Sequence, residues 1–281
     1  MNATVAAGTG FATAESLLRD SGLPRNEGLL LLSRLLGIER WRLTVHPETE
    51  VSPQQCAAAR EWFERRRAGE PIAYLLEERE FFGLALRVTP DVLIPRPETE
   101  RLVELALESV APGVPTRVLE LGTGSGAVAI AMSSERPGAE IAASDVSDAA
   151  LAVARDNARR RGATIDFLHG DWFEPVGSML FDLIVSNPPY IAARDPHLAR
   201  GDVRFEPRLA LVGGEDGMDH IERIADRARN HLVPNGRVLL EHGYDQGERC
   251  VELLRGLGYC EVEDFADLAG LPRVCVGRWR G

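Results

Sequence analysis

Lysine is absent from this sequence of 281 residues, so arginine supplies all 32 strongly basic side chains. A chain without lysine cannot form a Schiff base with a carbonyl substrate, and it cannot contain the phosphate-binding lysine of a Walker A motif. Catalysis through a covalent lysine adduct and nucleotide hydrolysis of the P-loop type are therefore excluded.

Cysteine is also scarce. The sequence has no C-x-x-C pair and no histidine cluster at metal-ligand spacing near its four scattered cysteines, Cys56, Cys250, Cys260 and Cys275. We expect these side chains to be reduced thiols in or near the core, and we expect no metal site.

Long apolar runs are missing. No stretch approaches the roughly 18 uncharged residues that a membrane-spanning helix needs. The first residues lack the basic start and the continuous apolar run of a secretory signal. We therefore expect a cytoplasmic protein with no membrane partner.

The charge of the chain is negative, with a formal net value of -11. Residues 1–85 carry 10 Arg and 12 acidic side chains, and the remainder carries 22 Arg and 31 acidic side chains. An enzyme that acts on nucleic acid usually has a basic footprint on its working domain. The acidic excess therefore predicts no direct nucleic-acid partner.

The N-terminal part of the chain is predicted to be helical. Residues 13–19 and 25–36 have the apolar spacing of short helices. A third helix is predicted from Pro53 to about residue 68, because Ser52 is a suitable N-cap and Gln55 lies three residues after it. Residues 1–78 are thus expected to form a small helical bundle.

Residues 79–96 are predicted to form a β-hairpin between two domains. Apolar residues lie on both sides of Thr89-Pro90-Asp91, which is a typical turn sequence. We expect this hairpin to link the bundle to the rest of the chain.

Residues 97–281 alternate between predicted helices and strands. Such alternation indicates a doubly wound α/β domain with a parallel sheet. Helices are expected at 98–108, after Gly126 and at 148–161, and strands at 117–120, 141–145, 165–169, 181–186, 238–241, 261–265 and 274–278. The last two strands are too close for a helical crossover, so they are expected to pair as an antiparallel edge hairpin.

A glycine-rich turn follows the first of these strands and opens a helix: Gly122, Thr123, Gly124, Ser125 and Gly126. This geometry brings backbone N–H groups close to a ligand. The turn also fits the dinucleotide pattern G-x-G-x-x-A when Ala127 is included. By itself it predicts a bound cofactor without identifying it.

Two further segments are predicted to contact that cofactor. Asp145 lies at a strand end 19 residues after Gly126, where a carboxylate can accept hydrogen bonds from both ribose hydroxyls. Asp171 and Trp172 follow the next strand and could bind the edge and the face of an adenine ring. These residues favour a ribose-containing cofactor, either NAD or S-adenosylmethionine.

The predicted chemical site is Asn187-Pro188-Pro189-Tyr190. Two prolines cannot continue a strand, so residues 181–186 must end here, at the carboxyl edge of the sheet where doubly wound folds bind ligands. We expect this strand to lie beside the one that carries the glycine turn. Asn187 would then face the cofactor.

The residue types in this loop suit attack by a planar NH2 group on a methyl sulfonium. The nitrogen becomes positive as it attacks, and acceptors on its two N–H bonds stabilise that charge. The Asn187 side-chain oxygen and the Pro188 carbonyl can be those acceptors, and Tyr190 can lie flat against the planar group. No catalytic histidine is needed, and we interpret His169 and His242 as structural.

With these motifs the chain closely resembles the HemK/PrmC family of protein-glutamine methyltransferases. Besides GTGSG and NPPY, the resemblance rests on PIAYL at 71–75, LIPRPETE at 93–100 and DVRFEP at 202–207. It covers most of the chain. Two departures occur, Glu120 where aspartate is common and Leu76-Glu77-Glu78 in a stretch that often carries glycine.

The resemblance implies a class I, Rossmann-like methyltransferase domain that uses S-adenosyl-L-methionine. The implied substrate is the glutamine of the Gly-Gly-Gln motif in class I peptide chain release factors, whose methylation supports translation termination. The N-terminal bundle would help to dock the release factor, and we expect a monomer. The family's cofactor contacts fall on Gly122 to Gly126, Asp145, Trp172 and Asn187, and its glutamine-binding segment on Asn187, Pro188, Pro189 and Tyr190.

Three questions stay open on the sequence alone. The same loop would suit the NH2 group of adenine or guanine, although the acidic charge and the flanking motifs favour a protein substrate. The glycine turn could also belong to a nucleotide-binding oxidoreductase or to a non-catalytic module. Arg96, Glu98 and Glu206 could line the substrate cleft or brace the hairpin against the catalytic domain.

Overall fold

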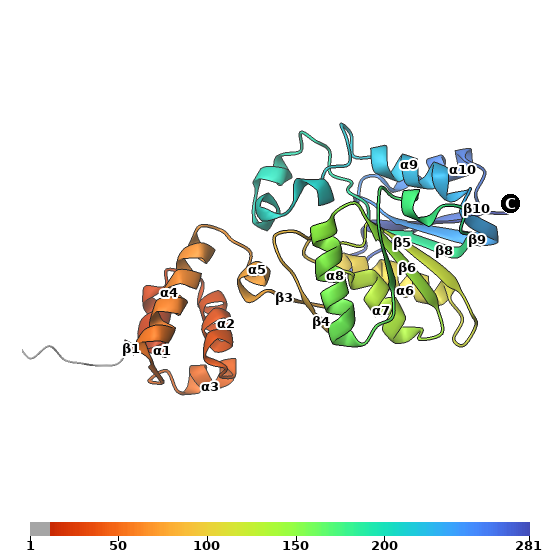
Figure 1. The fold of residues 1–281 in the computed structure, drawn as a ribbon. Helices are drawn as coiled ribbons and strands as arrows, with labels where there is room; N and C mark the ends of the chain where they lie inside the picture. Colours follow the sequence, from red (N-terminus) through yellow and green to blue (C-terminus); the bar gives the residue numbers. More distant parts are fainter. Residues whose placement is uncertain (1–11) are drawn as a thin grey trace, which may run out of the picture. The chain divides into compact units, whose positions relative to one another are not determined.

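The computed structural model describes residues 12–281, so residues 1–11 of the predicted N-terminal domain lie outside the described part. The chain divides into two compact units, Met1–Glu77 and Glu78–Gly281, and each has its own core (Figure 1). The predicted hairpin region falls within the second unit.

The first unit is a small helical bundle. Its helices are α1 (Ala14–Asp20), α2 (Arg25–Leu36), α3 (Arg40–Val45), α4 (Pro53–Arg67) and α5 (Ile72–Leu76), and the short strands β1 (Ala12–Thr13) and β2 (Glu50–Val51) pair antiparallel. The predicted capping box of α4 is confirmed, since the Ser52 hydroxyl accepts from Gln55 N–H at 3.3 Å. The sequence did not predict α3 or α5, which are too short to show a helical period.

The β-hairpin differs from the prediction. Its strands are β3 (Glu78–Phe81) and β4 (Leu84–Arg87), with the turn at Phe82 and Gly83. Both turn residues have positive φ, +50° and +72°, which is the conformation of a tight two-residue hairpin turn. Thr89-Pro90-Asp91 does form a turn, with the Val92 N–H donating to the Thr89 carbonyl at 3.1 Å, but this turn is not the hairpin's, and residues 92–94 form no strand.

The second unit contains a seven-stranded sheet with the order β10-β11-β9-β8-β5-β6-β7. Its strands are β5 (Arg117–Leu121), β6 (Glu140–Asp145), β7 (Asp166–His169), β8 (Phe181–Ser186), β9 (Leu232–Glu241), β10 (Cys260–Ala266) and β11 (Pro272–Arg278). β11 runs antiparallel to both of its neighbours, β10 and β9, and the remaining strand pairs of this sheet are parallel. The predicted edge hairpin is confirmed, with β10 outermost and β11 inserted beside β9.

Helices cover both faces of this sheet, as predicted (Figure 1). One face packs against α6 (Glu100–Ser109), α7 (Ala127–Glu135) and α8 (Asp148–Arg161), and the other against α9 (Asp219–Ala228) and α10 (Gly247–Gly256). Along β5, Val118 belongs to the first core and Leu119 to the second, because successive strand side chains point to opposite faces.

Short 3-10 turns complete the second unit. They are η1 (Pro97–Thr99), which precedes α6, η2 (Glu174–Val176), and η3 (Pro196–Ala199), η4 (Asp202–Phe205) and η5 (Arg208–Ala210) between β8 and α9. Across residues 12–281, none of the helices combines the length and the apolar character that crossing a membrane requires.

Candidate active site

The glycine turn lies where β5 ends and α7 begins. Gly122, Gly124 and Gly126 all have positive φ, at +70°, +54° and +82°, which is the region that favours glycine. A Cβ on Gly122 would come within 3.2 Å of Cζ3 of Trp172, and one on Gly126 within 3.2 Å of the Ala154 Cβ. Any other residue at these two positions would therefore be strained or crowded.

Glu120, on β5, forms hydrogen bonds to the glycine turn and to α7. Its buried carboxyl accepts hydrogen bonds from the Thr123 hydroxyl at 2.7 Å and from the Ala129 N–H at 3.0 Å. Burial raises the pKa of Glu120 to about 8, because the charged form loses its solvation. Glu120, noted in the sequence only as a departure from the family that the chain resembles, thus connects β5, the glycine turn and the start of α7.

Asp145 ends β6 beside the turn. Its Oδ2 accepts from the Gly124 N–H at 2.8 Å and its Oδ1 from the Ser147 N–H at 2.9 Å. Burial raises the pKa of this carboxyl above its usual value, while these backbone donors act in the opposite direction. A carboxylate has about four lone-pair positions, so Asp145 can still accept from two ribose hydroxyls.

Trp172 follows β7 and has a positive φ of +52°. Its carbonyl accepts from the Ser144 hydroxyl at 3.0 Å, which fastens this strained residue to the end of β6. The indole lies close to Gly122, and its centroid is 5.4 Å from that of the His220 ring. An apolar plane is thereby held next to the glycine turn.

These residues line one cavity of about 230 Å³ at the carboxyl edge of the sheet. Of the residues predicted from the sequence, those that line it are Gly122, Gly124, Asp145, Asp171, Trp172, Asn187 and Pro189. Thr123, Ser125 and Gly126 shape the turn without lining the cavity, and neither Pro188 nor Tyr190 is among the lining residues. The cavity therefore joins the predicted cofactor and chemical sites.

Sequence reasoning missed several residues of this cavity. Among them are Asp91 and Val92 after the hairpin, Leu209 and Ala210 in η5, and His220 on α9, which had no signal in the sequence. Leu93 and Pro207 also line the cavity, and they belong to the LIPRPETE and DVRFEP segments, which the sequence singled out without placing them in the site. Leu209 is 61% exposed, so the rim of the cavity on this side carries an accessible apolar side chain.

Asn187 follows β8, which pairs with β5 as predicted. The Ser186 hydroxyl donates to the Leu121 carbonyl at 2.8 Å and joins the ends of these two strands. The Asn187 Nδ2 donates to the Thr99 Oγ1 at 3.1 Å. Because the nitrogen is used in this bond, the side-chain oxygen is left as an acceptor next to the cavity.

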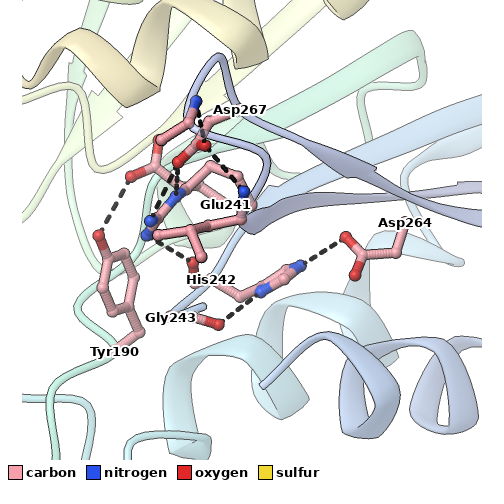
Figure 2. Close-up of polar contacts among 9 residues, drawn as sticks. Tyr190, Glu241, His242, Gly243, Asp264 and Asp267 are labelled. Atoms are coloured by element: carbon pink, nitrogen blue, oxygen red, sulfur yellow. Dashed lines mark hydrogen bonds and ion pairs between the residues drawn. The ribbon is translucent and has the colours of Figure 1, made fainter. Parts of the chain in front are cut away.

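Tyr190 is anchored by a buried carboxyl. Its hydroxyl donates to Oε1 of Glu241 at 3.2 Å, as Figure 2 shows. Burial raises the pKa of Tyr190 well above its usual value, so the phenol is neutral. Burial also raises the pKa of Glu241 to about 7, although hydrogen bonds from Thr99 and Tyr190 and the charge of Arg273 oppose that rise.

The sequence left open the roles of Arg96, Glu98 and Glu206, and these residues make contacts in two different places. Arg96 Nη2 contacts both oxygens of Glu206, at 2.7 and 2.8 Å, and the Glu206 side chain is fully buried. This pair ties the segment before η1 to the segment after η4, which favours the bracing role. Glu98 acts instead on the carboxyl of Glu241 through its charge.

The two histidines interpreted as structural do not line the cavity. His169 Nε2 contacts the Val146 carbonyl at 3.0 Å. His242 is fully buried, with Nδ1 at 2.8 Å from the Gly243 carbonyl and Nε2 at 3.0 Å from Oδ1 of Asp264 (Figure 2). His242 thereby connects the end of β9 to β10.

Two family models match the chain. One is described as "Methyltransferase small domain" and matches residues 101–201, and the other as "PrmC N-terminal domain" and matches residues 11–76. The second match falls within the helical unit.

Similar curated proteins cover nearly the whole chain. A release factor glutamine methyltransferase of Bordetella pertussis is 50% identical over 264 residues, which is 94% of this chain and 98% of that protein. The protein of the same name from Escherichia coli is 45% identical over 267 residues, covering 95% and 96% of the two chains.

The fold recurs among solved structures. A methyltransferase from Pyrococcus furiosus has a TM-score of 0.54 at 22% identity and covers 76% of this chain and 96% of its own. A 16S rRNA N2 G1207 methyltransferase from Thermus thermophilus, in complex with AdoMet and guanosine, has a TM-score of 0.52 at 20% identity and covers 72% and 50%. The likeness shows the class I methyltransferase fold.

Proposed function

The chain belongs to the family of release factor glutamine methyltransferases, and we propose that it methylates the Gly-Gly-Gln glutamine of class I peptide chain release factors. The methyl group moves from S-adenosyl-L-methionine to the side-chain amide nitrogen, in support of translation termination. One observation carries this proposal: Asn187 directly follows β8 beside the glycine turn, with its amide nitrogen bonded to Thr99.

The cavity fits the cofactor. Asp145 keeps acceptor positions for the ribose hydroxyls, the positive-φ glycines let backbone N–H groups approach, and the Trp172 indole offers a plane for the adenine. S-Adenosyl-L-methionine supplies an electrophilic methyl group on a positive sulfur. The acidic cavity edge at Asp145 and Asp171 is also compatible with that positive charge.

The acceptor amide is held by the loop. A glutamine NH2 is a weak nucleophile, because its lone pair is delocalised into the carbonyl. The Asn187 Oδ1 and the Pro188 carbonyl accept its two N–H bonds, so that the positive charge that develops on nitrogen is stabilised. Tyr190 lies against the planar group and fixes its direction. In-line placement of the nitrogen and the methyl group supplies the rest of the rate enhancement without a general base. The nitrogen then releases one proton.

We assign docking of the release factor to the N-terminal unit, since the family model for this unit matches a separate domain that does not carry the cavity. We further propose that the reaction takes place in the cytoplasm, where translation terminates, and that the enzyme acts as a monomer. Contact with nucleic acid is not required, in keeping with the net charge of -11.

The competing acceptor is an exocyclic NH2 group of adenine or guanine. Incubation with S-adenosylmethionine carrying a labelled methyl group distinguishes the two, when purified release factor, duplex DNA and ribosomal RNA are offered separately. We expect label in the release factor only. Label that enters nucleic acid and leaves the release factor unlabelled would refute the proposal.

A further inference from the structure

Thr99 and Glu241 lie behind the Asn187-to-Tyr190 loop and contact its two ends. The Asn187 Nδ2 donates to the Thr99 Oγ1 at 3.1 Å, and the Tyr190 hydroxyl donates to the Glu241 Oε1 at 3.2 Å. We propose that Thr99 and Glu241 are positioning residues that orient the Asn187 amide and the Tyr190 ring toward the acceptor. This inference rests on the proposed function of the loop.

The direction of the Asn187 amide matters because its two ends have opposite chemistry. Its oxygen can accept hydrogen bonds from the N–H groups of an acceptor amide, whereas its nitrogen would place its own N–H groups against them. A rotation of 180° about the last side-chain bond exchanges the oxygen and the nitrogen and leaves the shape of the amide almost unchanged. Something outside the amide must therefore decide which end faces the cavity.

Thr99 can fix the direction of the Asn187 amide only if the direction of its own hydroxyl hydrogen is fixed. A hydroxyl has one hydrogen to donate and can also accept. Ionised Glu241 can only accept, and its Oε2 is buried without a hydrogen-bond partner among the described residues. The Thr99 side chain acts on this carboxyl as a donor that lowers its pKa. The Thr99 proton then points to Glu241, and the Thr99 oxygen is left to accept from Asn187. The chain of donors thus runs from Asn187 through Thr99 to Glu241, with the Asn187 oxygen facing outward.

Glu241 is suited to this role by its surroundings. It is fully buried at the end of β9. The charged or titratable groups that face it are Tyr190 after β8, Arg273 on β11 and Glu98 in η1. Arg273 favours the ionised carboxylate, and it is itself held by Asp267 Oδ2 at 3.2 Å and by the His242 carbonyl at 3.3 Å.

Protonation of Glu241 would reverse this order. A carboxylic acid can donate to Thr99, whose hydroxyl would then be free to donate to the Asn187 oxygen. Because burial places the pKa of Glu241 at about 7, the orientation of Asn187 should depend on pH near neutrality. The turnover number should therefore rise as pH rises through about 7.

A pair of variants at Thr99 tests the first link. Thr99→Val keeps the shape and loses the hydroxyl, and Thr99→Ser keeps the hydroxyl. Thr116→Val is the matched control, since Thr116 is a buried threonine whose hydroxyl bonds only the Val114 carbonyl. The measurements are kcat and KM for release factor, the Kd of S-adenosylmethionine and the melting temperature.

We expect Thr99→Val to lower kcat at least about tenfold, with Thr99→Ser and Thr116→Val within about twofold of wild type. The Kd of the cofactor and the melting temperature should stay close to wild type in all three. The proposal is overturned if Thr99→Val keeps kcat within about twofold. It is also overturned if Thr99→Val changes the Kd of the cofactor or the melting temperature and leaves kcat unchanged.

Glu241→Gln tests the second link. Glutamine is nearly isosteric, but it does not titrate and its NH2 group can donate to Thr99, so it cannot fix the hydroxyl. We expect a lower kcat and loss of the dependence on pH around 7. Wild-type kcat and an unchanged pH profile would overturn the role of Glu241. The ratio of variant kcat to wild-type kcat can be measured with any NH2 acceptor that the wild type methylates. If the assigned acceptor is wrong, the wild type itself fails to methylate release factor, and this result is distinct from a failure of the positioning proposal.

Discussion

The Asp145 carboxylate accepts a hydrogen bond from the Gly124 backbone N–H at 2.8 Å. One side chain at the end of β6 therefore holds the glycine turn that follows β5. The same carboxylate lines the cavity, where its remaining lone pairs are available to a ribose. Asp145 thus shapes the cofactor site and is also part of its surface.

Asp145→Asn should weaken the binding of S-adenosylmethionine by about tenfold to a hundredfold, the range for losing charged hydrogen bonds worth about 1.5–3 kcal/mol. Isothermal titration calorimetry measures the Kd. Asp148→Asn is the matched control, because Asp148 is an exposed acid in the first turn of α8 that does not line the cavity. Equal affinities of the two variants would remove Asp145 from the cofactor site.

Asn187→Ala should leave the affinity for S-adenosylmethionine nearly intact and lower methyl transfer by at least about a hundredfold. This is the scale expected for the loss of one positioned group that stabilises charge in the transition state. Single-turnover transfer to release factor measures the effect, and Asn230→Ala, at an exposed position after α9, serves as the control. Undiminished transfer would exclude Asn187 from the mechanism.

The buried carboxyl of Glu120 should make stability depend on pH. Its pKa is raised from 4.5 to about 8 in the folded protein, so between these values the native state binds a proton that the unfolded chain has released. This contribution is complete below pH 4.5 and is lost as pH rises through about 8, by up to about 1.4 kcal/mol per pH unit.

Denaturant unfolding of wild type and Glu120→Gln at several pH values measures that contribution. Glutamine can still accept from Thr123 and the Ala129 N–H, but it carries no charge to bury. The stability of wild type relative to the variant should fall as pH rises from about 5 to 8. Glu206 and Glu241 also have raised pKa values, but they are present in both proteins and cancel in the difference. A constant difference would contradict the assignment.

Removal of residues 1–75 should raise the KM for intact release factor more than the KM for a small glutamine analogue. The docking surface would be lost, whereas the cavity and both cores of the second unit would remain. Steady-state kinetics with the two substrates measure the ratio. If both KM values rise equally, the N-terminal unit does not dock the release factor.

Local sequence signals predicted the elements that build the cavity. The strand over residues 181–186 and the helix over 148–161 have the predicted bounds. The strand ends as predicted because two prolines cannot continue it, and in the structure the Ser147 side chain caps the helix by accepting from the Ala150 N–H. The glycine turn opens α7 as predicted. These patterns work because each depends on neighbouring residues.

Errors occurred where tertiary contacts decide the conformation. The hairpin turns at Phe82, a bulky residue at positive φ, while Thr89-Pro90-Asp91 is the better turn sequence. The predicted strand at 238–241 begins at Leu232, because pairing of Phe181 with Leu232 extends β9 through Pro234-Asn235-Gly236. Both outcomes depend on segments far away in the chain.

The residues behind the catalytic loop had no signal in the sequence. Thr99 and Asn187 are 88 residues apart, and Tyr190 and Glu241 are 51 apart. A threonine in a charged segment and a glutamate at the end of an apolar strand are ordinary residues when taken alone. The sheet order brings the end of β9, and with it Glu241, next to the loop after β8, whereas Thr99 reaches the loop from η1.

Mass spectrometry of a release factor after reaction tests the central claim most directly. Purified release factor is incubated with the enzyme and S-adenosylmethionine, digested, and sequenced by fragmentation. The account predicts a single methyl group on the side-chain nitrogen of the glutamine in Gly-Gly-Gln. A methyl group on any other residue, or an unmodified release factor under conditions where the enzyme consumes the cofactor, would contradict it.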